Sequence, residues 1–180
     1  GLSRLVRREA PSVRTILGGP HGTLTRAAYR RASKLGLSHA RAYSAWSKLE
    51  AEFDTIVVGD GELALFEALE STSKLIDADH PTSRHWLTPD RLESAPWPAR
   101  HLLDVSSYRY MIAGRRSLSL IAQLGCPFNC GFCGGRESPS LRVARFRDVN
   151  RVVAEVKHLY ESYGVTGFMF YDDELNISED

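Results

Sequence analysis

One stretch organises this sequence: Gly125-Cys126-Pro127-Phe128-Asn129-Cys130-Gly131-Phe132-Cys133. It holds all three cysteines of the chain, with three residues between the first two and two between the last two. Three thiolates from one short loop can hold three irons of a four-iron cubane cluster and leave the fourth iron without a protein ligand. The glycines and the proline suit a loop that folds tightly around an inorganic core. The stretch therefore predicts metal ligands at Cys126, Cys130 and Cys133, and an open iron where a small molecule can react.

The pattern Cys-x-x-x-Cys-x-x-Cys, with Phe132 directly before the third cysteine, resembles the cluster loop of radical S-adenosylmethionine (SAM) enzymes. An apolar run at 117–122 precedes it as an expected strand, and an expected helix and strand follow. The resemblance implies a 4Fe–4S cluster on the three cysteines, SAM at the open iron, a cofactor contact from Phe132, and reductive cleavage of SAM to a 5′-deoxyadenosyl radical. It also implies a small-molecule substrate and an electron donor such as flavodoxin or ferredoxin.

Two other metal or thiol arrangements compete with this interpretation. A structural zinc site needs four ligands, and the fourth would have to be a distant histidine such as His101 or His158. A disulfide framework conflicts with the odd cysteine number and the short spacings. A third possibility is a non-catalytic iron–sulfur module that binds a partner or carries electrons, although such carriers normally use four cysteines.

The bulk composition is that of a soluble globular protein with one or two domains: 180 residues, 43% hydrophobic and 25% charged. No apolar run approaches the roughly 20 residues needed to cross a bilayer, and no secretory signal opens the chain. Thiolates kept for a cluster need a reducing compartment, so we expect a cytoplasmic protein.

Charge is unevenly spread along the chain. Residues 1–48 carry ten basic residues and one acid, whereas residues 49–95 carry three basic residues and eleven acids. We expect oppositely charged solvated faces rather than nucleic-acid binding, because the arginines are scattered and no binding motif accompanies them.

The first half of the chain repeats a strand, a glycine loop and a helix. Expected helices cover 2–9, 24–35, 39–51 and 63–70, and expected buried strands cover 13–17 and 55–58. The strands run into Gly18-Gly19-Pro20-His21 and Gly59-Asp60-Gly61-Glu62. This is the α/β layout, in which ligands sit at the carboxyl ends of strands.

These two glycine loops, ahead of the cysteine stretch, resemble the C-terminal half of the cobalamin-binding domain found in front of many radical SAM enzymes. The resemblance implies cobalamin contacts at Gly18, Gly19, Gly59 and Gly61. The family's Asp-x-His-x-x-Gly loop does not occur in this chain, so it lies upstream or is lacking. For His21 we favour a loop residue that hydrogen-bonds to backbone over a ligand. A cobalamin-independent radical SAM enzyme with a degenerate front domain remains the alternative.

The second half begins with residues 71–112, which lack sustained periodicity and contain several prolines. Past the cysteines, we expect the arginines Arg136, Arg142, Arg145 and Arg147 to be mostly surface charge. An amphipathic helix is expected over 149–163, with Asp148 as its N-cap and Gly164 as its stop.

The strand expected at 166–171 leads into Asp172-Asp173-Glu174. Acids at the carboxyl end of a parallel strand occupy an active-site position in barrels. The resemblance implies that Asp172 or Asp173 accepts hydrogen bonds from the SAM ammonium, and we favour Asp173. The alternative is a solvated helix start.

The sequence thus predicts an α/β protein in three parts: a partial Rossmann-like cobalamin-binding domain at 1–72, a linker at 73–112, and the first β–α–β unit of a radical SAM (β/α) partial barrel at 113–180. If cobalamin binds, the resemblance implies methyl transfer or related radical chemistry. We expect an internal fragment of a longer protein that is inactive alone, and the sequence does not indicate its substrate.

Overall fold

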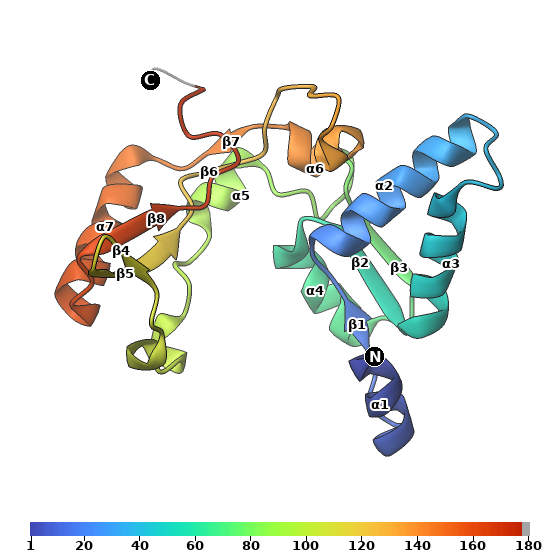
Figure 1. Ribbon diagram of the computed structural model, residues 1–180, viewed down its shortest axis with the longest axis horizontal. Coiled ribbons are helices and arrows are strands. Elements are labelled where there is room, and N and C mark those ends of the chain that lie inside the picture. The colour runs from blue at the N-terminus through green and yellow to red at the C-terminus, as the bar shows by residue number, and fades with distance from the viewer. Residues whose placement is uncertain (178–180) are drawn as a thin grey trace. The chain divides into compact units, whose positions relative to one another are not determined.

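The computed structural model describes residues 1–177 and shows a mixed α/β protein with parallel strand pairing (Figure 1). It contains two compact units. The first comprises 1–87 and 127–142, and the second comprises 88–126 and the described residues from 143 onwards. The domain limits expected from the sequence stay a prediction. No helix within residues 1–177 is both long and apolar enough to cross a membrane.

The first unit is built on a parallel sheet in the order β1 (Ile16–Leu17), β2 (Thr55–Gly59) and β3 (Leu75–Ala78). The central strand β2 is buried from Thr55 to Val58, as its continuous apolar run predicts. The strand β1 is shorter than the sequence predicts, and β3 is not predicted by the sequence at all. Only two residues of the expected strand 13–17 pair with β2, and β3 is four residues long, too short for a clear period.

Helices cover both faces of this sheet, α2 (Pro20–Lys34) and α3 (Arg41–Glu52) on one face and α4 (Gly61–Glu70) on the other, while α1 (Leu2–Glu9) buries no residue and binds Glu52 at the end of α3. Trp46 of α3 packs with Ile56 and Val58, while Ala64 and Ala68 of α4 pack with Val57 and its neighbours on β3. Successive β2 side chains therefore face opposite layers, as strand geometry requires. The helix α2 begins four residues earlier than expected, because Pro20 is tolerated in a first helical turn.

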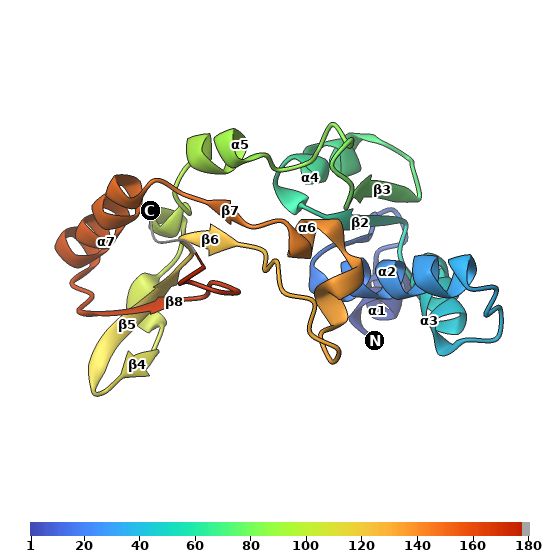
Figure 2. The same cartoon turned by 90° about the horizontal axis from the view of Figure 1, so that it is seen from above.

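Residues 127–142, which follow the first cysteine, also belong to this unit. They form the 3₁₀ helix η3 (Gly134–Glu137) and the short helix α6 (Pro139–Arg142). The helix η3 lies beside α2 (Figure 2), and Glu137 forms an ion pair with Arg31 of α2.

The second unit contains one β–α–β crossover. The strand β5 (Arg115–Leu120) pairs parallel with β8 (Gly167–Phe170) and antiparallel with β4 (Met111–Ile112), and α7 (Val149–Tyr163) connects β5 to β8 in the chain. The strand and helix predictions are confirmed here. The carboxylate of Asp148 accepts from Arg151 N at 3.2 Å, and Gly164 ends the helix with φ +62°.

Smaller elements complete the second unit. They are α5 (Pro89–Ser94), η1 (Arg100–Leu102), η2 (Val105–Ser107), and the antiparallel pair β6 (Gln123–Leu124) and β7 (Arg145–Phe146).

The helix α7 buries Leu159 completely, and it also buries the carboxylate of Glu155. Arg100 and Arg147 each bind that carboxylate at 2.8 Å. These buried ion pairs link α7 to η1, which contains Arg100, and to Arg147, which directly follows β7.

Candidate functional site

The three cysteines carry free thiols. Cys126 is half-buried and belongs to the second unit, whereas Cys130 and Cys133 are exposed and belong to the first. A turn joins the last two, since Cys133 N donates to Cys130 O at 3.1 Å. Phe132 between them is 94% exposed, and its predicted cofactor contact stays a prediction.

The thiols match a four-iron cluster in type and number, because three thiolates leave one iron open. Among residues 1–177, however, no three His, Cys, Asp or Glu side chains lie close enough to hold a metal together. The zinc site with His101 or His158 stays an alternative prediction.

The acids after β8 hold the backbone that precedes Cys126. Asp172 Oδ1 accepts from Ala122 N at 2.8 Å and also from Gln123 N, and Asp173 Oδ2 accepts from Gly125 N at 2.9 Å. In the described chain, Asp172 Oδ2 is buried without a hydrogen-bond partner. The turn thus braces the approach to the cysteines and leaves one acceptor unused.

Gly125 itself cannot be replaced without strain. Its φ is +79°, and a Cβ there would lie 2.8 Å from Val143 C and still closer to Val143 O. The tight loop expected from the sequence is therefore enforced on the side of the first cysteine by a close backbone approach.

The arginines past the cysteines form more hydrogen bonds and ion pairs within the protein than the sequence predicts. Arg142 donates to Pro127 O at 2.7 Å and to Asn129 Oδ1 at 3.1 Å, and Arg136 donates to Gly131 O at 2.8 Å. Arg145 is 2% exposed and Arg147 binds buried Glu155, so surface charge was the wrong expectation for these two. Arg147 also donates to Ile121 O at 2.6 Å, a contact across 26 residues that no local pattern could reveal.

The four glycines of the predicted cobalamin contacts differ in their surroundings. At Gly59, with φ +83°, a Cβ would lie 2.6 Å from Ala78 O and closer still to Asp79 N, so the close approach of β3 already requires glycine. Gly19 has φ +85° but open space around it, and Gly18 and Gly61 are also open. His21 is not in a loop. It is exposed in the first turn of α2, where its carbonyl accepts from Thr25.

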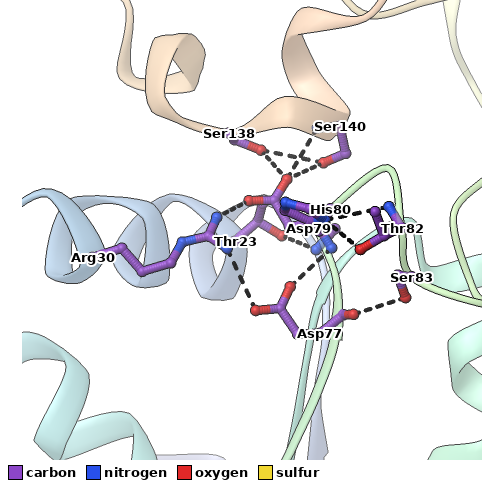
Figure 3. Close-up of polar contacts among 10 residues, drawn as sticks. Thr23, Arg30, Asp77, Asp79, His80, Thr82, Ser83, Ser138 and Ser140 are labelled. Carbon is purple, nitrogen blue, oxygen red and sulfur yellow. Dashed lines mark hydrogen bonds and ion pairs between the residues drawn. The ribbon is translucent and has the colours of Figure 1, made fainter.

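Sequence reasoning missed Asp79, which lies fully buried just beyond β3. Its carboxylate binds Ser138 and Ser140 of the segment after the cysteines (Figure 3). An acid that follows an apolar strand is a usable signal, but here the strand itself went unrecognised.

Comparison with known proteins gives two distant relatives. Over 195 aligned residues the chain is 25% identical to an uncharacterised methyltransferase of Pyrococcus horikoshii, covering 99% of this chain and 37% of the relative. Over 143 residues it is 31% identical to the anaerobic magnesium-protoporphyrin IX monomethyl ester cyclase of Cereibacter sphaeroides, covering 69% of this chain and 22% of the relative.

No family model matches the chain, and no solved structure matches it significantly. The chain spans well under half the length of both curated relatives. What the comparisons establish is a distant similarity to proteins named as a methyltransferase and a cyclase, both of them enzymes.

Proposed function

We propose that this chain is part of a radical SAM enzyme whose 4Fe–4S cluster is held by Cys126, Cys130 and Cys133. The observation that carries the proposal is the three-cysteine loop that lies in the chain between β5 and α7, the first strand and the helix of a parallel β–α–β crossover. Similarity to a named methyltransferase and a named cyclase supports an enzymatic role. A small-molecule substrate and an electron donor such as flavodoxin or ferredoxin belong to the same proposal.

When bound, the cluster supplies the electron that breaks a carbon–sulfur bond of SAM. The residues of this chain bind and orient. The three thiols hold the irons, and Asp172 and Asp173 fix the backbone at 122–125 through its N–H groups. The unused Oδ2 of Asp172 is a hydrogen-bond acceptor for the ammonium of SAM. Asp173, which we favoured from the sequence, is the more exposed of the two acids.

We further propose that the first unit is part of a Rossmann-like cobalamin-binding domain and the second part of a radical SAM partial barrel. The parallel sheet with glycines at the ends of β1 and β2 supports this assignment. The open backbone at Gly18, Gly19 and Gly61 leaves room for a ligand to approach, and Gly59 stays among the proposed contacts. With cobalamin, the activity would be methyl transfer or related radical chemistry. A front domain that only acts as a scaffold is the second candidate.

The first test is metal content after anaerobic reconstitution of the full chain with iron, sulfide and hydroxocobalamin. Stoichiometric iron with cobalt supports the cobalamin-dependent form. Iron without cobalt supports the scaffold form, and zinc in place of iron contradicts both.

Cys130→Ala should abolish the cluster, because two remaining thiolates cannot hold three irons. Iron, sulfide and the EPR signal of the reduced cluster are the measurements. Phe128→Ala is the matched control, since Phe128 is a half-exposed residue of the same loop without a ligand atom. A reduced-cluster signal that survives Cys130→Ala would show the ligand assignment to be wrong.

Asp172→Asn tests the acceptor proposed for SAM. The amide keeps one oxygen for the backbone of 122–123 but replaces the other oxygen with a donor, so we expect cluster-loaded protein to bind SAM about tenfold more weakly. Binding is measured by calorimetry, with Asp173→Asn as the paired variant. Unchanged affinity in both would remove these acids from the SAM site.

A further inference from the structure

We infer that Asp79 is a positioning residue for the cysteine loop: its buried carboxylate fixes the segment directly after Cys133. The inference rests on the proposed function, because the loop matters only if its thiols hold a cluster. Asp79 follows β3 at the carboxyl edge of the parallel sheet of the first unit, and its side chain is 0% exposed. All of the contacts described below lie within that unit.

The carboxylate of Asp79 joins two parts of the unit that are about sixty residues apart in the sequence (Figure 3). Oδ1 accepts from Ser138 Oγ at 2.6 Å, from Ser140 Oγ at 2.7 Å and from Ser140 N at 3.0 Å. Oδ2 is bound by the guanidinium of Arg30, which also reaches Asp77 at 3.4 Å. Ser138 and Ser140 are themselves buried. One side chain therefore anchors three donors of the segment and a cation of α2.

The anchored residues connect to Cys133 through one short helix. Cys133 is the N-cap of η3, and Ser138 follows its last residue. Ser138 N donates to Gly135 O at 2.9 Å. A Cβ on Gly135 would meet Leu141 at 3.3 Å and Cys133 Sγ at 3.6 Å, so Gly135 of η3 lies against Leu141 of α6 and near the thiol. Four 3₁₀ residues span only about 8 Å, which limits how far Cys133 can move once Ser138 is fixed.

The remainder of the loop is braced from the same segment. Arg136 of η3 holds Gly131 O, and Arg142 of α6 holds Pro127 O and Asn129 Oδ1. These braces work only if η3 and α6 are themselves held in place. Asp79 supplies that hold, together with the ion pair between Arg31 and Glu137.

A carboxylate suits this position better than a neutral side chain. Every group that faces it is a donor, so an amide at residue 79 would turn an N–H towards the serines or towards Arg30. A fully buried charge is tolerated only when it is paired and hydrogen-bonded, and this one is saturated. Its orientation is thus fixed, and it transmits that fixed geometry to the loop.

The test compares two ways of breaking the contact. Asp79→Asn removes the charge, and the double variant Ser138→Ala with Ser140→Ala removes the donors while keeping the pair between Asp79 and Arg30. Asp77→Asn is the matched control, because Asp77 of β3 binds the same arginine but makes no hydrogen bond to residues 127–142 in the described contacts. The amide oxygen of the asparagine can still accept from Asp79 N, as Asp77 Oδ1 does at 3.0 Å.

Two readouts are taken on the full chain. In cluster-free protein, trypsin cleavage after Arg136 and Arg142 reports local opening of the segment; we expect it to be about tenfold faster in both test variants and unchanged in Asp77→Asn. After reconstitution, iron per chain and the line shape of the reduced-cluster EPR signal report the ligand geometry. We expect less retained iron and an altered signal in the test variants only.

Cleavage that is equal in all variants would overturn the inference, because the contact would then not hold the segment. Faster cleavage with normal iron retention and an unchanged EPR signal would also overturn it, since the contact would hold the segment without positioning the thiols. A wild-type protein that takes up no iron would refute the proposed function itself, and this is seen before any variant is compared.

Discussion

Gly59→Ala should destabilise the first unit more than either of two other glycine substitutions in it. The added methyl group meets two penalties. A left-handed φ of +83° costs an alanine roughly 1–2 kcal/mol. The Cβ would also lie 2.6 Å from Ala78 O and closer to Asp79 N, and forcing such contacts in a packed region costs about 1–3 kcal/mol. Because both obstacles are backbone, no side chain can rotate away. The expected total is therefore about 2–5 kcal/mol, a large fraction of ordinary domain stability.

Two other glycines separate these penalties. Gly19→Ala carries the positive φ without a neighbour within 4 Å, and we expect only about 1–2 kcal/mol. Gly61→Ala carries neither penalty and sits in the first turn of α4, so we expect a change within about 1 kcal/mol. Denaturant unfolding followed by tryptophan fluorescence measures all three, since Trp46 packs on β2. If Gly59→Ala costs no more than Gly19→Ala, the close approach of β3 does not explain this glycine.

Two further predictions concern charge. Hydrogen bonds from the backbone N–H of Thr15 and then from its hydroxyl hold the pKa of Asp54 below its ordinary 3.8. This contact therefore stabilises the fold fully above about pH 3.8, and its contribution is lost as the pH falls through the lowered pKa. Unfolding measured from pH 7 to pH 3 should show the difference in stability between wild type and Asp54→Ala becoming smaller in acid, and a constant difference would contradict the argument. Glu155→Ala removes the carboxylate that pairs two nearly buried arginines and should lower the free energy of unfolding by about 3–5 kcal/mol. Glu161→Ala on the same helix removes only an exposed ion pair with Lys157, so in thermal unfolding it should change stability by at most about 0.5 kcal/mol.

The parts of the fold that the sequence predicted correctly are those whose signal is local. The helix 149–163 has the expected aspartate cap and glycine stop and buries Val152 and Leu159 of its apolar stripe, although Val153 and Tyr160 of the same stripe are exposed. The buried run at 55–58 became the central strand β2. By contrast, β3 was missed because Leu75–Ala78 becomes a strand only by pairing with β2. A four-residue segment with one acid has no period of its own to display.

In the candidate site, too, the residues with a local sequence signal could be predicted and those defined by tertiary contacts could not. Three cysteines at this spacing favour metal binding through their residue type alone, so Cys126, Cys130 and Cys133 can be proposed as ligands from the sequence. The partners of an acid or an arginine cannot be named in that way. The carboxylate of Asp173 accepts a hydrogen bond from the N–H of Gly125, and Arg147 forms an ion pair with Glu155 of α7. These pairings depend on which strands become neighbours.

Carboxylates act on both sides of the cysteine loop, each within its own unit. On the side of Cys126, Asp172 and Asp173 accept from the backbone N–H groups of 122–125. On the side of Cys133, Asp79 accepts from Ser138 and Ser140. Under the proposed function, the cysteines between these anchors are the ligands, and the carboxylates outside them fix the flanking backbone. Substitutions at the anchors should therefore alter the properties of a bound cluster, while substitutions at the cysteines abolish it.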